Sequence, residues 1–152
     1  MKSFVAAISV LVFCTFQINA EPQGKYVNSA SARLVKLVDK SNEQGFKLTN
    51  DGFSIGGGWL KQGTQNWVPM FTINLQAGKQ YRFIAVGDMD AKDVDLQVLD
   101  GNGKVVASDT TTAPESVVTY TPNTSGRHVV QLRLYSSNEN YPSVCIAIIM
   151  VR

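Results

Sequence analysis

The sequence has little of what most catalytic and metal sites require. Its 152 residues include two cysteines and one histidine, too few for a zinc site, which needs clustered Cys and His ligands. The sequence also has no H-E-x-x-H motif and no phosphate-binding loop. The one histidine, His128, alternates with Val130 and Leu132 in a predicted strand, where packing is its commoner role. We therefore expect a protein that is not an enzyme, and a hydrolase is the least favoured alternative.

Long apolar runs are absent apart from one at the start of the chain. Met1-Lys2 supplies a short positive segment, the stretch from Phe4 to Phe16 is largely apolar, and Ala20 is a small residue at a suitable cleavage position. This is the layout of a secretory signal peptide over residues 1–20, and its apolar run is too short to span a bilayer. We expect cleavage after Ala20 and export to the periplasm or to the extracellular medium.

An excess of charge of one sign is absent as well. Loss of residues 1–20 would leave 13 basic and 12 acidic residues in residues 21–152, a length typical of one domain. This balance gives no argument for a nucleic acid or an anionic membrane as partner, and no second apolar run could span a membrane. The oligomeric state stays open. Cys145 would be the only cysteine left, either buried as an inert thiol or paired with a second copy through a disulfide.

The beginning of this exported chain is predicted to contain one helix. Residues 21–30 are polar and small and are expected to form a tether. From Ser31 onward, apolar residues recur at helical spacing, which predicts a helix over residues 31–44, with Gly45 ending it in a left-handed conformation. Its apolar face is narrow, so we expect the helix to lie against the side of the main body.

Residues 45–152 show strand periodicity instead. Turn signals recur about every eight to twelve residues, the strongest being the Asp100-Gly101-Asn102-Gly103 hairpin. The stretch that begins at Tyr81 is apolar on both faces towards its end, as in a central strand. No helices intervene between the strands. The predicted fold is therefore mainly β, an antiparallel jelly-roll-like β-sandwich of about seven to eight strands with one N-terminal helix.

Three segments of this region together resemble a known family. They read Asp93-Val-Asp-Leu-Gln-Val-Leu-Asp-Gly-Asn-Gly-Lys-Val-Val-Ala-Ser-Asp109, Val117-Val-Thr-Tyr-Thr-Pro122 and Ser125-Gly-Arg-His-Val-Val-Gln-Leu-Arg133. They are similar to motifs of the bacterial pre-peptidase C-terminal (PPC) domain family, although His128 stands where the last motif has Tyr. The likeness covers about residues 67–151.

The resemblance implies both a fold and a class of function. Domains of this family are jelly-roll-like β-sandwiches, usually appended to secreted peptidases and other exported enzymes, and some relatives bind polymers such as collagen or polysaccharide. No enzyme accompanies the domain in this sequence, so we expect a free-standing exported module that follows an N-terminal helix.

A group of aspartates is the sharpest polar cluster in the sequence. Asp88, Asp90, Asp93 and Asp95 lie within eight residues, and loop carboxylates are the ligands that calcium prefers. The segment lacks the residue order of an EF-hand. Two interpretations stay open: a calcium site, or aspartates that stabilise a turn and strand ends through local hydrogen bonds.

Two tryptophans form the second candidate site. Trp59 and Trp67 flank a loop that contains Gln62, Gln65 and Asn66. Exposed aromatic rings beside amides are suited to sugars, because the ring stacks on the apolar face of a pyranose. The alternative is that both indoles pack at the edge of the sandwich.

These observations predict an exported, non-catalytic β-sandwich module that binds an extracellular or periplasmic polymer or a partner protein. The main alternative from another class is a calcium-stabilised structural domain without a specific ligand. Exposed indoles at Trp59 and Trp67 would favour the polymer, and convergent aspartate oxygens would favour calcium.

Overall fold

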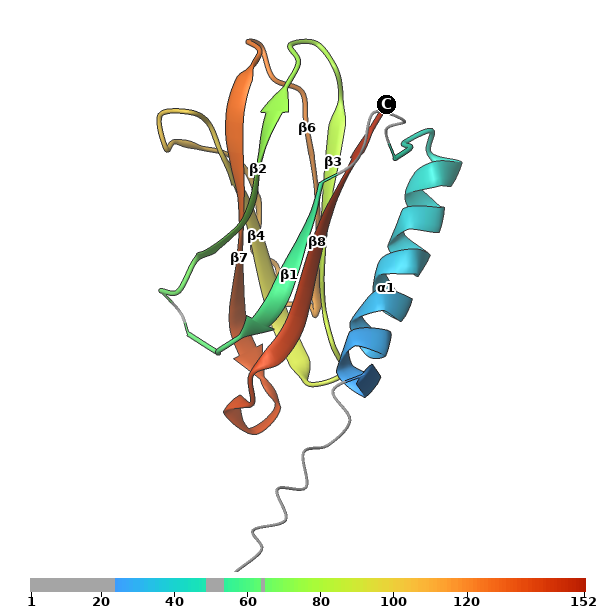
Figure 1. Cartoon of the computed structure of the whole chain (residues 1–152), viewed down its shortest axis with the longest axis vertical. Helices are drawn as coiled ribbons and strands as arrows, with labels where there is room; N and C mark the ends of the chain where they lie inside the picture. Colours follow the sequence, from blue (N-terminus) through green and yellow to red (C-terminus); the bar gives the residue numbers. More distant parts are fainter. Residues whose placement is uncertain (1–23, 49–53, 64) are drawn as a thin grey trace, which may run out of the picture.

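The chain folds as one helix packed on a two-layered β-sandwich (Figure 1). The computed structural model describes residues 24–48, 54–63 and 65–152. The predicted signal peptide, residues 1–20, lies outside these described residues. No helix among the described residues has the length and apolar character needed to cross a membrane.

The helix, α1 (Gly24–Glu43), begins earlier than the sequence predicts. A start at Ser31 was wrong, and most of the expected tether is helical. The apolar stripe continues one turn further back to Ala30, whose fully buried methyl lies against the sheet. Residues 24–30 include small residues and few large apolar ones, so they show no helical periodicity. Their helix propensity is nevertheless adequate for a helix.

The end of α1 is as predicted. Gly45 has φ +85°, its N–H donates to the carbonyl of Asn42, and the N–H of Phe46 donates to the carbonyl of Ser41. This pair of bonds is a Schellman motif, which requires a left-handed residue where Gly45 stands. The turn also places the ring of Phe46, which is 1% exposed, under the helix.

Eight strands form two four-stranded antiparallel sheets, so the β-sandwich prediction is confirmed. One sheet has the order β1-β8-β3-β6 and the other β2-β7-β4-β5. Each strand pairs with the strand that a long, rolled-up hairpin would place beside it, which is jelly-roll connectivity. The strands and the short 3-10 helix η1 are β1 (Ile55–Leu60), β2 (Val68–Leu75), β3 (Tyr81–Gly87), β4 (Ala91–Leu99), β5 (Val105–Asp109), β6 (Glu115–Tyr120), β7 (Gly126–Ser137), η1 (Asn138–Asn140) and β8 (Ser143–Val151).

The two sheets enclose the main core, and α1 covers a second one. Alternate residues of β3 face opposite cores: Phe83 points between the sheets, whereas Ile84 points towards the helix. Strand β8 does the same with Ile149 and Ile148. This explains the continuous apolar runs in both strands, because each is buried on two faces. The prediction that the helix lies against the main body is confirmed.

The other sheet is covered on one face only. Figure 1 shows α1 beside β3 and β8, on the side away from β2, β7 and β4. Among the described residues, no helix or strand packs over the outer face of the β2-β7-β4-β5 sheet. Exposed side chains on this outer face are therefore among those available for contact with other molecules.

Candidate functional site

Two surface hollows are lined in part by residues singled out from the sequence, and they lie on opposite sides of the sandwich. The aromatic groove has a volume of about 470 Å³ and lies beside the start of α1. The acidic cleft has a volume of about 290 Å³ and lies on the outer face of the β2-β7-β4-β5 sheet. The aromatic groove is lined by Lys25, Tyr26, Trp59, Met89, Asp90, Tyr141 and Pro142. The acidic cleft is lined by Asp93, Asp95, Thr110, Thr112, Arg133 and Tyr135.

Strand alternation directs Trp59 into the aromatic groove. Its neighbour Leu60 is 4% exposed and belongs to the core between the sheets, so Trp59 points to the outer face. The indole is 44% exposed and meets the ring of Tyr26 edge-on, with centroids 5.3 Å apart. The early start of α1 at Gly24 brings Tyr26 to this position, and the ammonium of Lys25 lies 5.0 Å from the Tyr26 ring centroid.

A second wall of the groove comes from the segment between β7 and β8. Tyr141 is 52% exposed, and its hydroxyl donates a hydrogen bond of 2.7 Å to Glu139. This bond to a carboxylate raises the pKa of Tyr141, so its phenol stays protonated. Glu139 and Asn140 have φ of 47° and 59°, a tight left-handed turn that fixes where Tyr141 emerges.

Asp88 acts as a structural residue beside the groove. It is fully buried, and its carboxylate accepts hydrogen bonds from the backbone N–H groups of Asp90 and Val144. Arg33 of α1 donates to the carbonyls of Gly87 and Asp88 at 3.1 and 2.9 Å. These bonds fix the β3–β4 turn, which presents Met89 and Asp90 to the groove.

The four predicted aspartates do not converge. Asp88 and Asp90 belong to the β3–β4 turn, whereas Asp93 and Asp95 are on the outer face of β4. In the part of the chain that the structure describes, no group of three or more His, Cys, Asp or Glu side chains could hold a metal ion. The calcium hypothesis was based on the short spacing of the four aspartates in the sequence. The turn and the bulges in β4 place the two pairs of aspartates apart in the structure.

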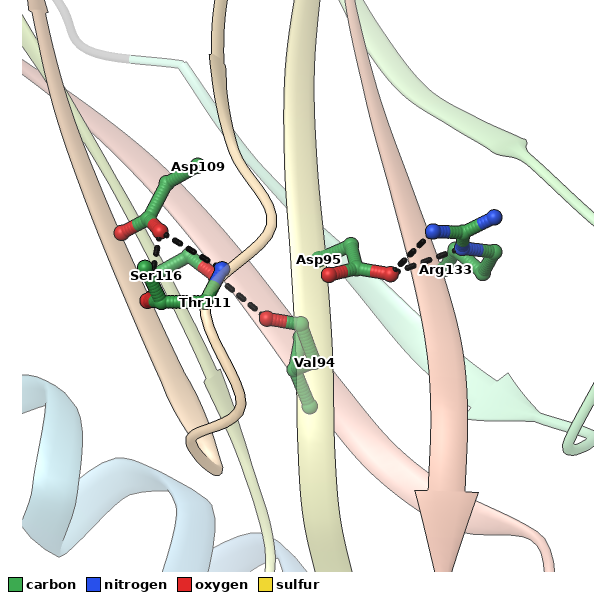
Figure 2. A network of polar contacts seen from close by, with 6 residues as sticks. All are labelled: Val94, Asp95, Asp109, Thr111, Ser116 and Arg133. Carbon is green, nitrogen blue, oxygen red and sulfur yellow. Dashed lines mark hydrogen bonds and ion pairs between the residues drawn. The ribbon is translucent and has the colours of Figure 1, made fainter. Parts of the chain in front are cut away.

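Figure 2 shows the ion pair that organises the acidic cleft. Arg133 on β7 extends across to Asp95 on β4, where its Nε and Nη2 lie 2.7 and 2.6 Å from Oδ2. The guanidinium carbon is 4.6 Å from the ring centroid of Trp67 and 5.0 Å from that of Tyr135. Asp95 is 1% exposed, so Arg133 neutralises a carboxylate that has little access to water.

Asp93 is the unusual residue of this cleft. Its side chain is 5% exposed, and its Oδ1 is buried without a hydrogen-bond partner among the described residues. Burial raises the pKa of Asp93, and the nearby Asp95 carboxylate raises it further, against the opposing effects of Arg133 and a hydrogen bond from the Ala113 N–H. A buried carboxylate with an incomplete set of partners is costly, and such groups occur often at binding sites.

Asp109, which lies near the acidic cleft, has a pKa shifted in the opposite direction to that of Asp93. Burial alone would raise the pKa of Asp109, but hydrogen bonds from Val117 and from the N–H and hydroxyl of Thr111 outweigh it and lower that pKa. Figure 2 shows the Thr111 contact, and next to it Ser116 donating to the carbonyl of Val94. These bonds hold the segment that carries Thr110 and Thr112 against β4.

The two tryptophans do not form one site. Trp59 lies on the face that α1 partly covers, and Trp67 contacts Arg133 on the opposite outer face. Gln62, the amide between them, accepts hydrogen bonds from the backbone and hydroxyl of Ser137 and has a structural role. Each indole instead has new neighbours, Tyr26 and Tyr141 at one, Arg133 and Tyr135 at the other. No sequence pattern joined these residues, because they come from strands and loops far apart in the chain.

His128 and Cys145 are both placed in the interior. His128 is 4% exposed on β7, its Nδ1 lies 2.9 Å from the carbonyl of Gly126, and it lines neither hollow. Cys145 is fully buried, and burial raises its pKa to about 12. Its thiol is therefore inert in the native protein and out of reach of a second copy, which decides between the two alternatives for this cysteine.

One hydrolase-like pattern lies in the sequence, Gly52-Phe53-Ser54-Ile55-Gly56, which fits G-x-S-x-G. In hydrolases that pattern places the serine on a turn between a strand and a helix. Here Ser54 is followed directly by β1, and its carbonyl accepts a hydrogen bond from the N–H of Ile149. His128 lies on a strand of the other sheet, so the pattern lacks the setting that the chemistry needs.

Comparisons with known proteins add no assignment. A scan against protein-family models finds no match, and a search of the curated proteins finds no relative. The resemblance to the PPC domain family stays a prediction.

Proposed function

We propose that this protein is an exported, non-catalytic binding module that holds a periplasmic or extracellular polysaccharide in the aromatic groove. The observation that carries the proposal is the Trp59 indole, 44% exposed on the wall of a 470 Å³ hollow together with Tyr26 and Tyr141. Large exposed rings are costly to leave in water and are the residues that most often dominate binding free energy.

The groove combines apolar walls with a few polar groups, as ligand sites usually do. Tyr26, Trp59 and Met89 supply apolar surface on which a sugar ring can stack, and Lys25 and Asp90 supply polar groups for hydroxyls. The walls are held by the helix, by β1 and by the bonded β3–β4 turn, so little ordering free energy is spent on binding. The layout of the N-terminal residues and the resemblance to PPC domains also favour an exported binding module.

The other functions weighed from the sequence have less support. A calcium-stabilised structural domain would need carboxylates that converge, and the predicted four are divided between two places. A hydrolase would need His128 in a cleft with a serine and an aspartate, whereas His128 is buried on β7 and lines neither hollow.

The test is affinity electrophoresis of the protein through gels that contain single neutral polysaccharides. We expect retardation by at least one of them, and Trp59→Ala should weaken it by about 30-fold, the loss of about 2 kcal/mol that is typical of a central aromatic contact. Trp67→Ala removes an equal indole from the opposite face and is the matched control. Equal losses for both variants, or retardation that Trp59→Ala leaves unchanged, would contradict the proposal, as would binding restricted to protein partners.

A further inference from the structure

The acidic cleft contains a charge that the fold leaves without a dedicated partner. Asp93 and Asp95 line it, with Asp109 close by, and among the residues that the structure describes Arg133 is the only basic one in its lining. Nε and Nη2 of Arg133 bond to Asp95, and among the described residues the Asp93 carboxylate accepts a hydrogen bond from the Ala113 N–H. The other oxygen of Asp93 is buried without a partner among the described residues.

We propose that the acidic cleft is a second binding site, specific for the primary ammonium group of an amino-sugar polymer, with Asp93 as the residue that recognises the ammonium. The cleft lies on the opposite outer face from the aromatic groove. The proposal does not depend on binding at Trp59, because no residue lines both hollows.

Three observations favour an organic ammonium. An ammonium supplies the charge and the N–H donors that the Asp93 carboxylate lacks. The ring of Tyr135 is 42% exposed at the cleft, and since the Arg133 guanidinium already lies 5.0 Å from its centroid, a ligand cation would contact the other face of the ring. The cleft lacks the three or more convergent ligands that a metal ion would need.

The remaining lining favours a sugar as the carrier of the ammonium. Thr110, Thr112 and the phenol of Tyr135 provide hydroxyl groups that can donate to and accept from ring hydroxyls. A sugar ring is rigid, whereas a lysine side chain loses several rotatable bonds when it is held, which costs binding free energy. We therefore assign the cleft to an amino sugar in preference to a lysine-bearing peptide.

The first experiment needs no variant. Calorimetric titration compares a glucosamine tetramer with the same tetramer fully N-acetylated, in which every amine is neutral. We expect the free-amine tetramer to bind at least about tenfold more tightly, the effect of one close charge pair. Once the amines of the tetramer are fully protonated, affinity should fall as the pH is lowered further, because the raised pKa of Asp93 means that its carboxylate is protonated early. Equal affinities for the two tetramers, or a lysine tetrapeptide that binds as tightly as the free amine, would overturn the proposal.

A pair of variants locates the binding. Asp93→Asn keeps the shape of the side chain and removes its charge, and we expect it to abolish the tenfold preference for the free amine. Asp39→Asn makes the same charge change on the exposed surface of α1 and should leave the preference intact. The preference should also persist in Trp59→Ala, which separates this site from the aromatic groove. A preference that survives Asp93→Asn, or disappears in Trp59→Ala, would contradict the assignment.

Discussion

The two sheets of the sandwich share a topology but differ in what covers them. The β1-β8-β3-β6 sheet is buried by the partner sheet on one side and partly by α1 on the other, and β3 and β8 are apolar on both faces. The β2-β7-β4-β5 sheet has an outer face without a cover among the described residues, and two of the cross-strand pairs on that face are polar. Gln97 donates to Gln131 at 2.8 Å, and Arg133 bonds to Asp95.

This difference shows that α1 gives the β1-β8-β3-β6 sheet additional apolar burial, although the aromatic groove also lies on the outer face of that sheet, beside α1. Apolar burial against α1 stabilises the covered sheet in proportion to the area removed from water. The open sheet is stabilised from within, and its outer face is free to carry charges and rings that are only partly satisfied. The acidic cleft is therefore on the sheet that can accommodate it at the lower cost in free energy of folding.

The largest expected loss of stability comes from a substitution in the core between α1 and the β1-β8-β3-β6 sheet. Phe46→Ala would remove a ring that is 1% exposed and is flanked by the guanidinium groups of Arg82 and Arg152, at 3.9 and 5.1 Å from its centroid. We expect a loss of about 4 kcal/mol in the free energy of unfolding, because truncation leaves a cavity between helix and sheet. Urea denaturation measures it. Val105→Ala, at a 45% exposed site on the open sheet, should change stability by less than about 0.5 kcal/mol. Similar losses at both sites would contradict the comparison.

On the β2-β7-β4-β5 sheet, the largest loss of stability should come from leaving the buried Asp95 carboxylate without its partner. Arg133→Met would leave the buried Asp95 carboxylate without its partner and should cost about 3 kcal/mol. The double variant Arg133→Met with Asp95→Leu removes both charges and should recover most of that loss. Thermal and urea unfolding of the two single variants and the double variant form a double-mutant cycle. A double variant that is as unstable as Arg133→Met would show that packing on Trp67, rather than the buried charge, is what matters.

The smallest expected effect is on the pH dependence of stability, in which Asp109 and Asp93 should differ. The lowered pKa of Asp109 means that its stabilising effect is present above the pKa of the unfolded chain and is lost as the pH falls through the folded value. Asp109→Asn should therefore cost about 1 kcal/mol at pH 7, and the difference from the unmodified protein should shrink towards pH 3.

Asp93 should behave in the opposite sense. Its raised pKa means that stability is fully present below the unfolded value and declines as the pH rises through the folded value. At pH 7, Asp93→Asn should leave the unfolding temperature unchanged or raise it slightly. Unfolding temperatures measured from pH 3 to pH 8 test both variants. Destabilisation by Asp93→Asn at neutral pH would show that the carboxylate is satisfied by partners other than those described above.

The sequence predicted those parts of the molecule that depend on local chemistry. Turn residues and alternation predicted the strands, Gly45 predicted the end of the helix, and the apolar run after Tyr81 predicted a central strand, because each signal acts within a few residues. The start of α1 was missed because Ala30 is buried by a close approach to the sheet, which no local pattern reveals.

The candidate sites were predicted less well, for a physical reason. Trp59 and Asp93 were identified as individual residues, but their neighbours come from other strands. Tyr141 joins Trp59 through the β7–β8 connection, and Arg133 reaches β4 by cross-strand pairing. Such contacts depend on register and topology, which one sequence does not specify.

The pairing of the first strand with the last has a consequence for the order of folding. Strand β8 pairs with both β1 and β3, and its residues contribute to both cores. Neither core is complete without the nine residues of β8, so both depend on the docking of this strand. Contacts over such long separations also slow the folding step itself. Strand β8 thus completes both cores. Loss of residues 143–151 would expose the core between the sheets and the core beneath α1 together.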